Sequence, residues 1–118
     1  FFSDMLVSDS NKQKLGSVHR RFGLLHKKYD LCDEHGKVFA TVKSPFWRIW
    51  TFPIFDLRGK EQGVISKKWA GALKEIFTDA DCFQLDFGMG NWTENQKAVI
   101  LATALSVDFD FFEDNQRN

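Results

Sequence analysis

A repeat of 23 to 24 residues runs through residues 9–69 and constrains the fold of this chain more than any other feature. Three kinds of landmark recur at this step: an aspartate, a β-branched residue and a large aromatic residue. At the aspartate, residues such as Asp, Asn and Gly favour a tight turn, and alternating apolar and polar residues flank it. Each repeat therefore predicts a β-hairpin. The landmarks are Asp9, Asp33 and Asp56; Val18, Val42 and Ile65; and Phe22, Phe46 and Trp69.

The alternation on both sides of the turns predicts seven short strands. Consecutive hairpins pair neighbour to neighbour, so we expect an antiparallel, curved meander. A solenoid of stacked repeats is the alternative for a fixed period, although the segment after residue 91 abandons the repeat. The expected strands are residues 5–8, 14–21, 27–32, 38–43, 50–55, 63–68 and 82–87.

A helix is predicted after Asn91, where the chain changes character. Thr93 and Gln96 have the spacing of a capping box, in which each side chain satisfies a backbone donor at the start of a helix. Apolar side chains of residues 98–107 then point in every direction around the axis, so this helix is expected to be buried on all sides or to lie in lipid. An aspartate at Leu101 should accordingly unfold the domain.

The length of the apolar run favours burial over a membrane span. Residues 98–107 rise about 15 Å, roughly half of a hydrocarbon core. Extending the helix brings in carboxylates, which are costly inside a bilayer. A helix threaded through a curved sheet is therefore the favoured interpretation, with a transmembrane segment as the alternative. The carboxylates are Asp108, Asp110, Glu113 and Asp114.

Composition excludes several classes of protein. A chain of 118 residues is one small domain, and 16 basic against 16 acidic residues leave no global positive field for nucleic acid. Cys32 and Cys82 are the only cysteines, which excludes a disulfide framework and a multi-cysteine zinc site. We expect a reducing, intracellular location: cytoplasm, membrane periphery or mitochondrion.

Three motifs resemble the phospholipid scramblase family. The family's I-S-K-x-W-x-G core is matched by residues 65–71, its F-T-D-A-D turn by residues 77–81, and its D-F-x-F-F-E ending by residues 108–113. Their order and spacing are those of the family. Residues 15–22 and 50–53 also look like the family, and more like its compact prokaryote-type or mitochondrial members than the Cys-rich animal proteins.

The resemblance implies an α+β fold: an antiparallel meander that forms part of a Tubby-like β-barrel around a buried hydrophobic C-terminal helix. The family barrel has twelve strands, so the chain would be the C-terminal portion of a family domain. We expect one domain over residues 1–118, with hairpin repeats over 1–91 and the central helix over 92–113. An incomplete barrel would leave an open sheet edge to which a protein partner could add.

Basic residues are the candidate contacts to anionic phospholipid, since each contributes about 1 kcal/mol near an acidic membrane surface. Arg20–Arg21 and Lys67–Lys68 occupy the same repeat position, which places them side by side on equivalent strands. The plainer interpretation is a solvated sheet face, or edge lysines that block aggregation. The candidates are Arg20, Arg21, Lys27, Lys28, Lys67, Lys68 and Lys74.

The acidic turn at Asp79 and Asp81 is a candidate calcium site, because the resemblance implies a calcium response there. As an EF-hand-like loop it fails at its sixth position, Gln84, and at its twelfth, Gly90. The plainer interpretation is a turn capped by these side chains. Calcium, if it binds, should do so with submillimolar to millimolar affinity, and no other cofactor is indicated.

Catalytic chemistry has little support in the sequence. No nucleophile elbow, phosphate loop or HExxH motif is present, and His19, His26 and His35 are expected to be solvated. Cys32 and Cys82 fit strand positions as small apolar residues. We therefore predict a non-enzymatic protein. It is either a phospholipid-binding domain at a membrane surface that promotes transbilayer lipid movement, or a Tubby-like scaffold for a protein partner or larger assembly.

Overall fold

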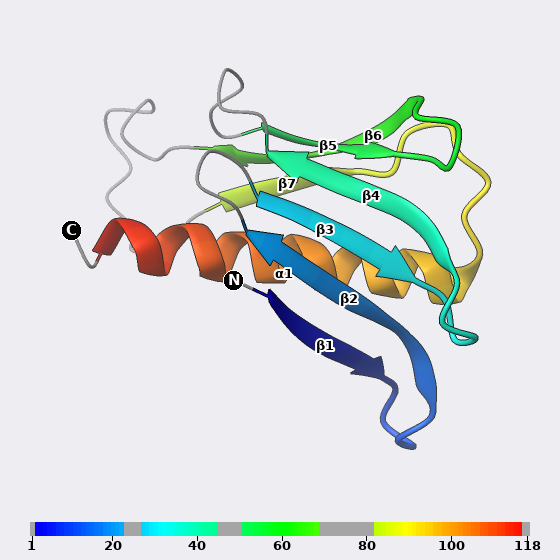
Figure 1. Cartoon of the computed structure of the whole chain (residues 1–118). Helices are drawn as coiled ribbons and strands as arrows, with labels where there is room; N and C mark the ends of the chain where they lie inside the picture. Colours follow the sequence, from blue (N-terminus) through cyan, green and yellow to red (C-terminus); the bar gives the residue numbers. More distant parts are fainter. Residues whose placement is uncertain (1, 23–26, 45–50, 69–81, 117–118) are drawn as a thin grey trace.

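The computed structural model describes the backbone of residues 2–22, 27–44, 51–68 and 82–116, and the side chains of 4–22, 27–43, 51–66 and 84–107. All seven expected strands are present, with ends that differ by a few residues from the prediction (Figure 1). The elements are β1 (Phe2–Ser8), β2 (Lys14–Phe22), β3 (Lys27–Cys32), β4 (Val38–Ser44), β5 (Thr51–Phe55), β6 (Glu61–Lys68), β7 (Cys82–Asp86) and α1 (Glu94–Gln116).

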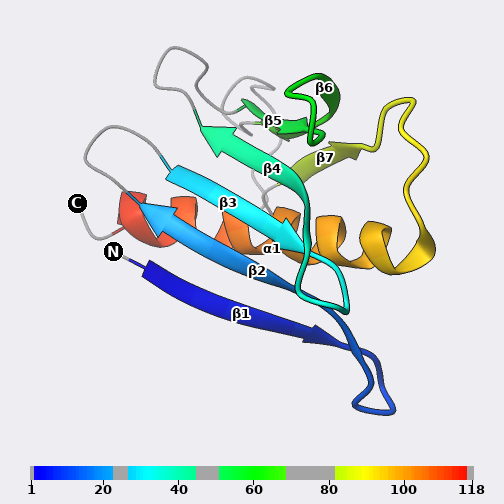
Figure 2. The ribbon, with the colours of Figure 1, turned by 45° about the vertical axis from the view of Figure 1, so that its right-hand side comes forward.

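The strands form one antiparallel sheet in the order β1-β2-β3-β4-β5-β6-β7. The sheet curls, and α1 lies along its concave side (Figures 1 and 2). This confirms the predicted α+β class: an antiparallel meander that forms part of a barrel around a C-terminal helix. A stacked solenoid is excluded for the described strands, because they share a single sheet.

The three aspartate-led turns have the same structure, which explains the repeat. In each turn, Oδ1 of the aspartate accepts hydrogen bonds of 2.9–3.0 Å from the backbone N–H groups two and four residues later. The third residue after each aspartate has positive φ: 64° at Lys12, 81° at Gly36 and 82° at Gly59. Glycine adopts this conformation without steric cost, whereas a lysine does so rarely. The first turn is therefore the least favourable of the three.

The concave face of the sheet and one side of α1 form the core. The β-branched residues of the repeat, Val18, Val42 and Ile65, are all buried there. Gly16 lets α1 approach β2, because a Cβ atom at this position would overlap the carbonyl oxygen of Cys32 and Cγ2 of Val99. The α1 residues of the core cluster are Val99, Ile100, Ala104 and Val107.

The start of α1 has the predicted capping box. The N–H of Gln96 donates to Oγ1 of Thr93 at 3.1 Å, and the N–H of Thr93 donates to Oε1 of Gln96 at 2.9 Å. Burial on every side is wrong, however, because Leu101 is 48% exposed and Leu105 is 54% exposed. The described sheet covers α1 from one side, and these residues lie on the other. Among the described residues, no helix has both the length and the apolar character needed to cross a membrane.

Candidate functional site

Strand alternation divides the predicted basic pairs between the two faces of the sheet. Successive side chains on a strand point to opposite faces. Arg21 and Lys28 therefore lie on the convex face. Arg20 and Lys27 lie on the concave face, the same face as the buried core residues two positions along each strand. There, Nζ of Lys27 lies 5.2 Å from the ring centroid of Phe22. The pairs Arg20–Arg21 and Lys27–Lys28 thus each contribute one residue to a convex-face site.

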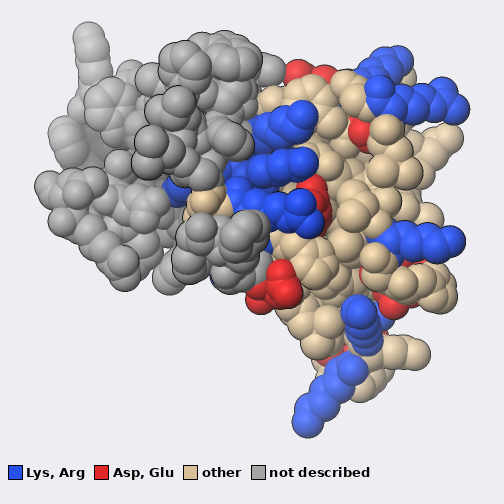
Figure 3. Space-filling model, viewed as in Figure 1, with Lys and Arg blue, Asp and Glu red and all other residues tan. Residues whose placement is uncertain are grey.

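A row of three basic residues crosses the convex face. Arg21 pairs with Lys28 across β2 and β3, and Lys28 pairs with Lys43 across β3 and β4. Figure 3 shows Lys and Arg side chains gathered over the middle of this face. Lys43 was not among the sequence candidates, although the register of the second hairpin places it opposite Lys28. Its Nζ lies 5.3 Å from the ring centroid of Phe55, so the apolar surface of β5 supports it. We call Arg21, Lys28 and Lys43 the basic row.

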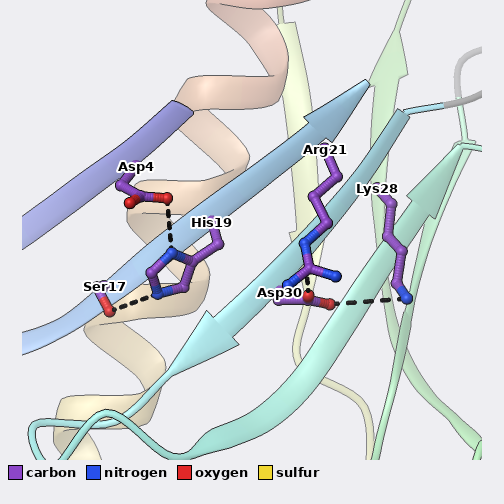
Figure 4. A network of polar contacts seen from close by, with 6 residues as sticks. All are labelled: Asp4, Ser17, His19, Arg21, Lys28 and Asp30. Atoms are coloured by element: carbon purple, nitrogen blue, oxygen red, sulfur yellow. Dashed lines mark hydrogen bonds and ion pairs between the residues drawn. The ribbon is translucent and has the colours of Figure 1, made fainter. Parts of the chain in front are cut away.

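Asp30 holds two members of the basic row in place (Figure 4). Its side chain is 10% exposed; Nε of Arg21 lies 3.4 Å from Oδ2, and Nζ of Lys28 lies 3.9 Å from Oδ1. The side chains of Arg21 and Lys28 remain 56% and 38% exposed, respectively. Three cations and one carboxylate leave the cluster with a net positive charge. The arrangement can therefore bind an anion with side chains that are already positioned.

The other sequence candidates are not brought into this row. Arg20–Arg21 and Lys67–Lys68 do lie on equivalent strands of the repeat, but the expectation that they lie side by side is wrong, because β3, β4 and β5 separate β2 from β6. The backbone of Lys67 and Lys68 pairs with β7. Their side chains lie outside the described residues, as do Lys74 and the calcium candidates Asp79 and Asp81. Within the side chains that are described, no group of three or more His, Cys, Asp or Glu could hold a metal ion.

A second polar cluster joins the edge strand β1 to β2 (Figure 4). Nδ1 of His19 lies 2.7 Å from Oδ1 of Asp4, and Nε2 of His19 lies 3.4 Å from Oγ of Ser17. Sequence reasoning missed this cluster, because it depends on the β1–β2 register. The chain of contacts from Asp4 through His19 to Ser17 resembles a hydrolytic triad. All three residues lie on strands of one sheet face, however, and Ser17 is buried there. Their contacts instead join the two strands.

Cys32 is not activated as a nucleophile. Burial, as the largest cause, raises the pKa of its thiol above the ordinary value, which keeps the thiol protonated at neutral pH. This agrees with its expected role as a small apolar strand residue.

A comparison with known protein families assigns this chain to one of them. The family model described as Scramblase matches residues 2–114. The chain belongs to the Scramblase family. The curled antiparallel sheet with one C-terminal helix is consistent with the Tubby-like fold that the sequence motifs implied.

The curated proteins to which this chain is similar include yeast and mammalian proteins. Altered inheritance rate of mitochondria protein 25 of Saccharomyces cerevisiae is 27% identical over 87% of this chain and 38% of its own length. Phospholipid scramblase 1 of Homo sapiens is 45% identical over 43% of this chain and 16% of its own length. A phospholipid scramblase family protein of Schizosaccharomyces pombe is 26% identical over 94% of this chain and 34% of its own length. The chain thus spans less than half the length of these relatives. No solved structure matches it.

Proposed function

We propose that this Scramblase family domain binds anionic phospholipid headgroups at a membrane surface through the basic row. The observation that carries the proposal is the register of Arg21, Lys28 and Lys43 on three adjacent strands, with Asp30 fixing two of them. Basic side chains held on one face attract acidic lipid headgroups. The other candidates stay predicted contributors outside the basic row: Arg20 and Lys27 on the concave side, and Lys67, Lys68 and Lys74.

Vesicle flotation tests this proposal. The protein is floated with vesicles of phosphatidylcholine alone and with vesicles that also contain phosphatidylserine, each with and without millimolar calcium. We expect binding to the acidic vesicles. Replacing all three row residues by Gln should lower that affinity on the order of a hundredfold, because each contributes about 1 kcal/mol. Calcium dependence would support the predicted site at Asp79 and Asp81.

A charge-matched variant controls for net charge. Lys12→Gln, Lys14→Gln and Lys37→Gln together remove three exposed basic residues that lie in the hairpin turns or at the strand end next to one. This variant should retain most of the affinity. An equal loss in both triple variants would assign binding to net charge and contradict the basic row. Thermal unfolding of each variant checks that the sheet is intact, since Arg21→Gln also removes a partner of Asp30.

Transbilayer lipid movement and peripheral membrane association are further parts of the proposal. Family membership supports both, and the yeast relative is named for mitochondrial inheritance, which supports a mitochondrial membrane as one location. Reconstitution into vesicles with a fluorescent lipid in one leaflet tests movement. Lipid movement between leaflets exposes more of the label to a quencher added outside the vesicles. The expected result is therefore a larger loss of protected fluorescence than in protein-free vesicles. Unchanged protection would limit the domain to lipid binding.

A scaffold for a protein partner is the second candidate function. Its support is the sheet order, in which β1 and β7 are the two edges of the described sheet. An edge strand can pair with a strand of another protein. Failure to float with either type of vesicle would favour this function over lipid binding.

We also propose, as the sequence motifs implied, that residues 1–118 are the C-terminal portion of a family domain.

A further inference from the structure

A shallow cavity of about 310 Å³, largely open to solvent, lies at the turn end of the sheet, away from the basic row. Five segments build it: β4, the β5–β6 turn, the start of β6, the loop between β7 and α1, and the first turn of α1. Figure 1 shows this loop running near the β5–β6 turn. The volume is at the low end for small-molecule sites, so the cavity suits a headgroup-sized ligand. Its lining residues are Phe39, Asp56, Leu57, Arg58, Gln62, Gly90, Asn91, Trp92 and Gln96.

Two aromatic residues give the cavity an apolar wall with a fixed orientation. The rings of Phe39 and Trp92 meet edge to face, with centroids 6.0 Å apart. Nε1 of Trp92 donates a hydrogen bond of 2.9 Å to the carbonyl oxygen of Phe87, which fixes the indole. Aromatic rings attract cations, including ligand ammonium groups. The wall therefore accepts a methylene or an ammonium group.

One carboxylate and one guanidinium lie together on the rim. Oδ1 of Asp56 accepts hydrogen bonds from the N–H groups of Arg58 and Lys60, and Oδ2 accepts one of 2.9 Å from the Gln62 side chain. The Gln62 bond is the largest cause that lowers the pKa of the Asp56 carboxyl, which is therefore ionised at neutral pH. The exposed guanidinium of Arg58 forms no ion pair with any residue that the structure describes. A negative and a positive group two residues apart complement a zwitterion.

Two apolar side chains project beside this rim. Leu57 is 73% exposed and Met89 is 94% exposed, the two highest values among the exposed large hydrophobic residues described. Leu57 lines the cavity from the β5–β6 turn, and Met89 precedes Gly90 on the opposite side. Exposed apolar side chains next to a cation suit a membrane interface, where the apolar parts enter lipid and the cation stays among phosphates.

We propose that this cavity binds the headgroup of a zwitterionic phospholipid. The ammonium group lies against Asp56 and the aromatic wall, the phosphate lies against Arg58, and Leu57 and Met89 enter the membrane interface. The inference rests on the proposed function in taking phospholipid as the partner, but it uses different residues. It adds a headgroup pocket for lipid of zero net charge to the surface that binds acidic lipid.

NMR titration with soluble headgroups tests the pocket without a membrane. Glycerophosphoethanolamine, whose phosphodiester carries the same single negative charge as the lipid headgroup, is titrated into labelled protein while the indole Nε1–H signal of Trp92 and the side-chain amide signal of Gln62 are followed. We expect saturable shifts of both signals. Arg58→Gln should weaken binding about tenfold through loss of one charge-assisted contact. Lys12→Gln, an exposed cation in the first turn, should leave binding unchanged. Unmoved signals, or an unchanged affinity in Arg58→Gln, would overturn the pocket.

Inorganic phosphate and ethanolamine, titrated separately, decide whether both charges are needed. The pocket requires each to bind at least about tenfold more weakly than glycerophosphoethanolamine. Equal binding of phosphate alone would overturn the zwitterion in favour of a simple anion site.

Vesicles then decide whether the ligand is a lipid. Leu57→Ser with Met89→Ser should lower binding to neutral phosphatidylethanolamine and phosphatidylcholine vesicles about tenfold. Leu6→Ser, which changes another exposed leucine, is the control. No difference between the variants would overturn a membrane source for the headgroup. If the basic-row variant keeps its binding to acidic vesicles while the headgroup shifts are seen, the proposed function fails and the pocket stands. If that variant loses its binding to acidic vesicles but the headgroup shifts are absent, the pocket fails and the proposed function stands.

Discussion

The two sides of α1 carry the same kinds of side chain but have different surroundings. Val99, Ile100 and Ala104 face the sheet and are each 0% exposed. Leu101 and Leu105 are about half exposed on the other side. Hydrophobicity alone does not distinguish these positions, since leucine is as apolar as isoleucine. Burial is decided by where the curled sheet ends, which is a property of the whole fold rather than of the helix sequence.

The largest expected effect is a charge on the buried side of α1. Ile100→Asp should lower the free energy of unfolding by about 3–5 kcal/mol, because it buries an unpaired carboxylate. Leu101→Asp should cost only about 1 kcal/mol, because that side chain is already half exposed. Urea unfolding followed by circular dichroism measures both. Similar losses in the two variants would show that both sides of α1 are covered in solution.

The contact between β2 and the buried side of α1 is tested by Gly16→Ala. The added methyl group would overlap the Cys32 carbonyl oxygen and the Val99 side chain, so the helix must move away from the strand. We expect a loss of about 1–3 kcal/mol in the free energy of unfolding, as for other overpacked cores. The double variant Gly16→Ala with Val99→Ala should recover part of it. If Gly16→Ala were neutral, α1 would not be packed tightly on β2.

A smaller effect is expected from a polar group within the buried side. Oγ1 of Thr103 is buried and donates a hydrogen bond of 2.8 Å to the Val99 carbonyl oxygen. Thr103→Val keeps the shape and removes the bond, which should cost about 1 kcal/mol. Leu105→Val is the control on the exposed side, with an effect of at most about 0.5 kcal/mol. Calorimetric melting temperatures compare the two variants.

The smallest expected effect is on the pH dependence of stability. It should appear in variants of the turns and not in variants of α1. Hydrogen bonds lower the pKa values of Asp33 and Asp56, with the Lys37 N–H and the Gln62 side chain as the largest causes, respectively. Each aspartate therefore stabilises the fold above its unfolded pKa, about 3.9, and loses this effect as pH falls through its folded value. Urea unfolding from pH 7 to pH 3 should show less acid sensitivity in Asp33→Asn with Asp56→Asn. Thr103→Val should keep the wild-type pH dependence.

The sequence predicts the sheet well because its local signals repeat. Each aspartate accepts the same turn hydrogen bonds, and the β-branched residues of the repeat alternate onto one face. Thr93 and Gln96 likewise determine the start of α1 through a contact between residues close in the chain. Features set within a few residues were therefore predictable.

Features that depend on strand register, or on which side of α1 the sheet covers, were predicted less well. The basic row needs the pairing of three strands, so Lys43 was missed, and Arg20 was grouped with Arg21 although the two point to opposite faces. The His19–Asp4 contact also requires the β1–β2 register. The cavity brings together residues from 39 to 96, and no local pattern indicates such a meeting.

The order of the elements has a consequence for synthesis. Every strand pairs with the strand made just before it, so hairpins can form as the chain leaves the ribosome. α1 follows all seven described strands, yet it packs against β2, which is made well before it. Until the helix is made, the apolar concave face of the sheet stays uncovered, which invites aggregation or chaperone binding. The described sheet therefore waits for α1, and a nascent chain whose strands have left the ribosome before α1 has would expose a sheet without its cover.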